Sequence, residues 1–210
     1  DGPLHGVPMT IKDTFEISGL RTTAGAQIFS QHIPKNTAIA AQRLMDAGAV
    51  IMGKTNVPEF ASDLQSYNDI FGVTNNPWDV TRTPGGSSGG AAAAAAAGLT
   101  ALEFGSDIGG SIRTPAHFCG IYGHKPTWGI VPSRGHVPGP PGTLGEADLA
   151  VMGPLARSAE DLALALNITA GPLEDEAIAW KLALPPPRHK TLKQFKVAAW
   201  LHDESFPLDT

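Results

Sequence analysis

Two glycine- and serine-rich loops, separated by a run of alanines, constrain this sequence more than any other feature. They lie within Pro84–Pro126, which reads PGGSSGGAAAAAAAGLTALEFGSDIGGSIRTPAHFCGIYGHKP. Glycine lets the backbone adopt positive φ and approach a ligand closely, and serine supplies a hydroxyl that serves as nucleophile or proton relay. The seven alanines between the loops predict a helix without bulk, able to pack tightly in a crowded interior. We therefore expect both loops to hold hydroxyls and backbone N–H groups in fixed positions.

The rest of the chain alternates short apolar runs with helical segments, which is typical of an α/β layer fold. A strand is expected at Val7–Ile11, with Lys12 and Asp13 directly after its end. A helix at 38–48 is expected to be capped by Asn36 and Thr37. The other expected strands are Ala49–Met52, Thr100–Phe104 and Phe195–Leu201. The other expected helices are a short one in Pro58–Ser62, the alanine helix that ends at Gly98, Ser111–His117 and Ala159–Ile168. Ser158 and Asp161 are expected to form a capping box for the last of these helices.

Several further stretches are predicted to be connections without regular structure. The loop-like stretch Asn68–Pro84 leads into the first glycine loop, and the turn Gly105–Gly110 precedes Ser111. Later in the chain, Gly135–Gly145 is predicted to be a Pro/Gly-rich surface loop and Pro185-Pro186-Pro187 a stiff linker.

Composition excludes several classes of protein. The net charge of −5 comes from 15 basic and 20 acidic side chains without a basic stripe, so nucleic acid is not an expected partner. No apolar run approaches the length of a membrane span, and the start does not resemble a signal peptide. The single cysteine, Cys119, excludes an internal disulfide and fits a reducing, cytoplasmic compartment. Because the first residue is Asp rather than Met, we expect the chain to begin inside a longer protein or to be processed.

Several long motifs in order resemble the amidase signature family of serine hydrolases. They are GVPMTIKD at Gly6–Asp13, GKTNVPEF at Gly53–Phe60, GGSSGG at Gly85–Gly90 and GSDIGGSIRTPAHFCG at Gly105–Gly120. The resemblance covers roughly residues 1–170. It implies an α/β fold with a mixed, twisted β-sheet flanked by helices on both faces, incomplete at both ends. Residues 1–210 would form part of a single catalytic domain, with core motifs at 6–130, a linker-like segment at 171–195 and the C-terminal portion absent.

Mapped onto this sequence, the family's Ser–Ser–Lys triad falls on Ser111 as nucleophile, Ser87 as relay and Lys12 as base. In the family the relay serine follows a cis peptide bond. A lysine accepts a proton only when neutral, so burial must lower the pKa of Lys12.

The resemblance also suggests what surrounds the triad. The backbone N–H groups of Ile108, Gly109, Gly110 and Ser111 would face the oxyanion. Three further side chains would support the site: Ser88, Asp107 and Arg113. From the residues alone, Asp107 and Arg113 either brace the loop as a pair or are two unrelated polar side chains.

The residue pattern leaves other interpretations open. His117 and His124 lie near the serines in sequence, so a histidine base is possible on physical grounds. Most lysines are solvated, which favours a surface Lys12 paired with Asp13, although the apolar strand before it points to a cleft. Lys54 follows a glycine without P-loop spacing, so we interpret it as a loop lysine.

Two positions depart from the family's usual pattern, His124 where an apolar residue is common and Trp128 where a smaller aromatic is common. Cys119 is interpreted as a small buried residue, because no positive partner is placed beside it to make it a nucleophile. No ligand spacing indicates a metal site.

The function expected is hydrolysis of a carboxamide through an acyl-serine intermediate, with a small-molecule amide as partner and no cofactor. Three alternatives remain: an amidotransferase subunit that releases ammonia for a partner protein, a non-catalytic binding module that retains the loops, and, from the glycine loops alone, a phosphate-binding module. The sequence leaves the substrate and the oligomeric state open, a homodimer included.

Overall fold

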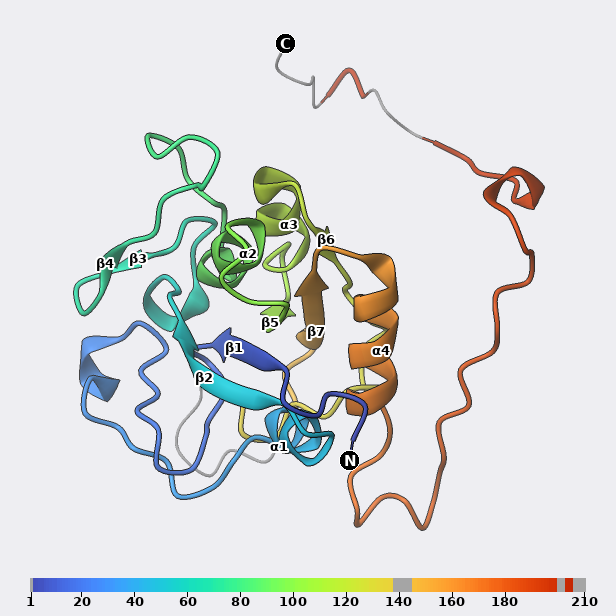
Figure 1. Cartoon of the computed structure of the whole chain (residues 1–210), viewed down its shortest axis with the longest axis horizontal. Helices are drawn as coiled ribbons and strands as arrows, with labels where there is room; N and C mark the ends of the chain where they lie inside the picture. Colours follow the sequence, from blue (N-terminus) through green and yellow to red (C-terminus); the bar gives the residue numbers. More distant parts are fainter. Residues whose placement is uncertain (1, 138–144, 200–202, 206–210) are drawn as a thin grey trace.

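A five-stranded sheet lies at the centre of the described part of the chain, in the strand order β2-β1-β5-β7-β6 (Figure 1). The computed structural model describes residues 2–137, 145–199 and 203–205. The strands are β1 (Pro8–Lys12), β2 (Val50–Thr55), β5 (Leu102–Asp107), β6 (Tyr122–Gly123) and β7 (Val151–Ala156). β1 pairs in parallel with β2 and β5, whereas β7 is antiparallel to both β5 and β6. The sheet is therefore mixed, as the resemblance implied.

Helices cover both faces of the sheet (Figure 1). On one face, α1 (Ile39–Asp46) and α4 (Ala159–Thr169) share a core with apolar residues of β1 and β5, including Met9 and Phe104. On the other face, α2 (Gly89–Ala96) and α3 (Arg113–Cys119) pack with Leu155 of β7. Strand side chains alternate between faces, so the sheet contributes to both cores. The α/β class predicted from the sequence is confirmed.

The alanine helix α2 lies close to the chain that follows β2. Its residues Ala91, Ala92 and Ala95 are fully buried. A Cβ at Gly90 would lie 2.4 Å from the backbone N of Asn56, so only glycine fits this contact. The close approach places the loop before α2 at the edge of the sheet where the parallel strands β1 and β5 end, the usual location for sites in α/β folds.

The predicted helix caps have different outcomes. Asn36 and Thr37 do not cap α1: its N-cap is Ala38, without a side-chain cap, and the Thr37 hydroxyl accepts from the Ser18 N–H instead. By contrast, the cap of α4 is confirmed, since Ser158 Oγ accepts from the Asp161 N–H at 3.1 Å.

Strand boundaries also differ from the prediction. The strand β2 runs on to Thr55, and β5 runs through Gly105–Asp107, where the sequence predicts a turn. In the region after Pro58, a 3-10 helix forms at Glu59–Ala61 and a small hairpin pairs β3 (Tyr67–Asn68) with β4 (Gly72–Val73).

The strand β7 has no counterpart in the prediction, because Gly153 and Pro154 interrupt its apolar pattern. The glycine is required there: a Cβ at Gly153 would lie 2.2 Å from the carbonyl oxygen of His124. Pro154 carries no N–H, but its carbonyl still accepts from His124 N at 3.0 Å.

After α4 the chain leaves the sheet and follows an extended, largely exposed path (Figure 1). Residues 195–199 form no strand, contrary to the prediction for Phe195–Leu201, whose last two residues lie outside the described residues. One 3-10 helix, Leu192–Gln194, interrupts this path, and another, Gln27–Phe29, lies near the N-terminus. Most of the predicted Gly135–Gly145 loop, residues 138–144, also lies outside the described residues.

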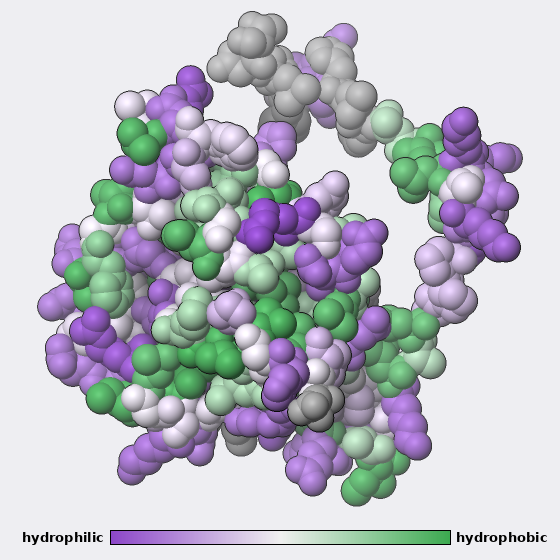
Figure 2. Space-filling model, in the orientation of Figure 1, coloured by the Kyte–Doolittle hydropathy of each residue, from purple (hydrophilic) through white to green (hydrophobic). Residues whose placement is uncertain are grey.

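The surface drawn in Figure 2 mixes hydrophobic and hydrophilic side chains. Within the described residues, none of the helices has the length and apolar character needed to cross a membrane.

Candidate active site

Lys12 is fully buried at the end of β1, with 0% of its surface exposed. Its Nζ lies 2.7 Å from Ser87 Oγ and 2.9 Å from Ser106 Oγ. Burial lowers the pKa of Lys12 to about 7, although the charge of Asp107 acts in the opposite direction. The alternative of a surface lysine paired with Asp13 is wrong. A pKa this far below the ordinary value of 10.5 leaves a substantial share of Lys12 neutral near neutral pH.

Ser87 and Ser88 precede α2 and are both buried. The Gly86–Ser87 peptide bond is cis, as the resemblance implied. A Cβ at Gly86 would lie 2.7 Å from the backbone N of Gln65, so this position has no room for a side chain. Ser88 joins the two glycine loops: its N–H donates to the Ser111 carbonyl at 3.1 Å, and its Oγ lies 3.3 Å from the Ser106 carbonyl.

Ser111 lies in the turn between β5 and α3 and is 8% exposed. In the described residues its hydroxyl forms no hydrogen bond, and none joins it to Ser87. The structure thus brings Lys12 and Ser87 into direct contact and holds Ser111 on the adjoining loop through the backbone of Ser88.

Asp107 and Arg113 form an ion pair across the turn that carries Ser111, with 2.8 Å between Arg113 Nη2 and Asp107 Oδ1. The buried carboxylate of Asp107 also accepts from the N–H groups of Gly110 and Ile112, both at 2.9 Å. Burial acts to raise the pKa of Asp107, but the hydrogen bonds from Arg113 and the backbone outweigh it and lower the pKa. The Gly110 N–H, one of the four expected oxyanion donors, thus donates to Asp107 in this structure.

Neither His117 nor His124 contacts the serines through a hydrogen bond in the part of the chain that the structure describes, and both side chains are exposed. A third histidine, His136, is partly buried and packs edge-on against Phe15, with 4.9 Å between ring centroids. Burial of its ring, with the charges of Lys12 and Lys54, lowers the pKa of His136 to about 3, so it stays neutral. The sequence around His136 carries no sign of this placement.

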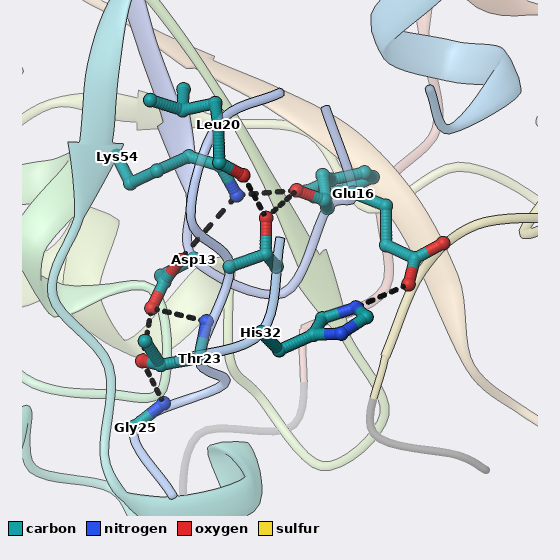
Figure 3. A network of polar contacts seen from close by, with 9 residues as sticks. Asp13, Glu16, Leu20, Thr23, Gly25, His32 and Lys54 are labelled. Atoms are coloured by element: carbon teal, nitrogen blue, oxygen red, sulfur yellow. Dashed lines mark hydrogen bonds and ion pairs between the residues drawn. The ribbon is translucent and has the colours of Figure 1, made fainter. Parts of the chain in front are cut away.

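A polar network fixes the chain just after Lys12 (Figure 3). Asp13 accepts from the N–H and hydroxyl of Thr23 at 3.1 and 2.5 Å, and Lys54 Nζ lies 3.4 Å from Asp13 Oδ1. Lys54 also donates to the carbonyl of Phe15. Only 10% of the Lys54 side chain is exposed, so its interpretation as a loop lysine is wrong. Burial lowers the pKa of Lys54 to about 8, although the pairing with Asp13 acts to raise it.

Two other buried groups have shifted pKa values. Cys119 is buried as predicted, and burial raises the pKa of its thiol to about 11, which leaves it protonated. Glu103 of β5 was not singled out by the sequence: burial raises its pKa to about 7, although hydrogen bonds from Thr10 and Thr100 act to lower it.

The chain matches the Amidase family over residues 1–210, and it therefore belongs to that family. It is 51% identical over 169 residues to the A subunit of glutamyl-tRNA(Gln) amidotransferase from Deinococcus deserti, and the match covers 80% of this chain and 34% of the relative. The chain thus spans about a third of the length of the curated relatives it matches.

Solved structures agree with this assignment. The A subunit of glutamyl-tRNA(Gln) amidotransferase from Thermotoga maritima superposes with a TM-score of 0.79 at 36% identity, covering 87% of this chain and 39% of that one. The peptide amidase of Stenotrophomonas maltophilia superposes with a TM-score of 0.75 at 36% identity, covering 84% of this chain and 36% of that one.

Proposed function

We propose that this chain carries the nucleophile, relay and base of a serine amidase, namely Ser111, Ser87 and Lys12. The observation that carries the proposal is the 2.7 Å contact between Lys12 Nζ and Ser87 Oγ in a fully buried setting. Burial keeps a large share of the lysine neutral, and a neutral amine hydrogen-bonded to a hydroxyl is a competent base. Among the described residues, neither His117 nor His124 has a hydrogen bond to Ser87 or Ser111.

In the proposed reaction, Ser111 Oγ attacks the carbonyl carbon of a carboxamide. Its proton passes to Ser87 Oγ, and the Ser87 proton passes to Lys12 Nζ. The amine leaves with the proton returned along the same route, so a C–O bond to Ser111 forms and the C–N bond breaks. A water molecule then attacks the acyl-serine, gives up its proton by the same relay, and releases the carboxylic acid and free Ser111.

The turn before α3 would stabilise the oxyanion. With the Gly110 N–H engaged by Asp107, the proposed donors are the N–H groups of Ile108, Gly109 and Ser111. Donors of this kind contribute about 10²–10³ in rate each. The bonds from Asp107 to the backbone would keep this turn in a single conformation, which is the preorganisation that such donors need.

A second candidate function is release of ammonia from glutamine for a partner protein. It is favoured by the 46–51% identity to A subunits of glutamyl-tRNA(Gln) amidotransferases. The same nucleophile and relay would act, with the side-chain amide of glutamine as substrate and ammonia as leaving group. A binding module that retains the loops without catalysis is the outcome if both activities are absent.

The test is hydrolysis by the full-length protein of glutamine and of a panel of aliphatic and aromatic amides, with Ser111→Ala as control. Release of an amine and a carboxylic acid that disappears in Ser111→Ala supports the amidase proposal. Ammonia release from glutamine that appears only with a co-purifying protein favours the amidotransferase. Turnover that survives in Ser111→Ala would overturn both.

A further inference from the structure

One buried hydroxyl outside the proposed triad holds the loop that carries Ser87. Ser66 lies just before β3 and is 1% exposed. Its Oγ donates to the carbonyl of Gly85 at 3.1 Å and accepts from the N–H of Gly89 at 3.0 Å. These two hydrogen bonds hold the segment 85–89 at its first and last residues, and Ser87 is its middle residue.

The surroundings of Ser66 leave this hydroxyl little freedom. A Cβ at Gly89 would lie only 2.3 Å from Ser66 Oγ, so the glycine is what allows the contact. The Ser66 carbonyl accepts from Thr74 N at 2.9 Å, which ties the residue to the end of the β3–β4 hairpin. Because Gly85 and Gly89 are buried, loss of the hydroxyl would leave a carbonyl and an N–H unpaired away from water.

We propose that Ser66 is a positioning residue for Ser87, and this inference rests on the proposed relay role of Ser87. By fixing both ends of the segment, Ser66 keeps Ser87 Oγ at hydrogen-bond distance from Lys12 Nζ, where the structure has 2.7 Å. In the described chain its hydroxyl bonds only to the backbone of this segment. Any effect of Ser66 on the reaction therefore passes through this segment, in which Ser87 is the residue that contacts Lys12. Its loss should slow the reaction of Ser111 without weakening substrate binding.

The first part of the test compares Ser66→Ala with a matched control, Thr169→Val, in the full-length protein. Thr169 also carries a fully buried hydroxyl on a backbone carbonyl, 2.8 Å from Ala165 O, but it lies on α4 across the sheet. The readout is the rate at which a fluorophosphonate labels Ser111, normalised to the folded fraction. Misplacement of a reacting group by about 1 Å costs roughly 10²-fold, so Ser66→Ala should lose about 10–100-fold while Thr169→Val keeps the wild-type rate.

The second part is a double-mutant cycle with Ser87→Ala. If Ser66 acts through Ser87, then adding Ser66→Ala to Ser87→Ala should cost nothing further, whereas two independent losses would multiply and overturn the inference. A wild-type rate in folded Ser66→Ala would overturn it as well. If Ser87→Ala itself is labelled at the wild-type rate, the proposed relay is wrong, and the inference falls with it.

A milder substitution guards against misfolding of Ser66→Ala. Ser66→Cys keeps the shape of the side chain with a weaker hydrogen-bonding group. We expect it to fold and to lose part of the rate, with that loss again absent in the Ser87→Ala background. A folded Ser66→Cys with unchanged rate, or with a loss that persists without the Ser87 hydroxyl, contradicts the positioning role.

Discussion

The rate at which Ser111 reacts should follow the deprotonation of Lys12. Burial lowers its pKa from 10.5 to about 7. At that pKa the neutral fraction is about 9% at pH 6, about 50% at pH 7 and about 91% at pH 8. The rate should therefore rise about tenfold between pH 6 and pH 8 and then level off. A solvated lysine would stay almost wholly charged over this range, and the rate would keep rising up to its ordinary pKa.

The same pKa determines how Lys12 affects stability. A pKa that changes by one between the unfolded and folded protein corresponds to about 1.4 kcal/mol, so folding disfavours the charged form by about 5 kcal/mol. The sign follows from the lowered pKa: the cost is absent above pH 10.5, grows as the pH falls toward about 7, and is constant below that. Lys12→Met should consequently fold more stably than the wild type near pH 7, even though it abolishes the reaction of Ser111.

The assay is the rate of fluorophosphonate labelling against pH, for the wild type and four variants. Lys12→Ala and Lys12→Arg should both lose several orders of magnitude, because neither offers a neutral amine. His117→Ala and His124→Ala should retain the wild-type profile. The reasoning is refuted if Lys12→Ala keeps its rate while a histidine variant loses the dependence on pH.

Two further substitutions test the framework of the site. Asp107→Asn removes the carboxylate that accepts from the N–H groups of Gly110 and Ile112. We expect denaturant unfolding to show about 1–3 kcal/mol lower stability, and fluorophosphonate labelling of Ser111 to be slower. An unchanged labelling rate would remove Asp107 from the proposed site. Gly90→Ala places a Cβ 2.4 Å from the backbone N of Asn56. Chemical unfolding should show that the free energy of unfolding falls by about 1–3 kcal/mol. Wild-type stability in this variant would mean that α2 can shift to make room for the side chain.

The candidate catalytic residues could be predicted from the sequence better than the residues that support them. Lys12 and Ser87 could be placed together, because the motifs that carry them resemble those of the amidase signature family. The brace formed by Asp107 on the Ser111 turn was one of two interpretations that the pattern allowed. Ser66 and Ser106 could not be found, since a lone serine carries no mark of its partner before the chain is folded.

The errors in the predicted fold also arise because tertiary contacts are not visible in the local sequence. The strand β7 contains Gly153 and Pro154, which oppose strand formation locally, yet pairing with β5 outweighs this local preference. Lys54 has the sequence surroundings of a solvated loop residue. It meets Asp13 only because β1 and β2 pair in parallel, and no local pattern reveals that pairing.

The site of covalent modification tests the proposed mechanism most directly. The full-length protein is labelled with a fluorophosphonate, digested, and the modified peptide is sequenced by mass spectrometry. We predict an adduct on Ser111, with the fluoride of the probe displaced by Ser111 Oγ, and none in Ser111→Ala. An adduct on Ser87, Ser88 or Cys119 instead of Ser111 would contradict the mechanism.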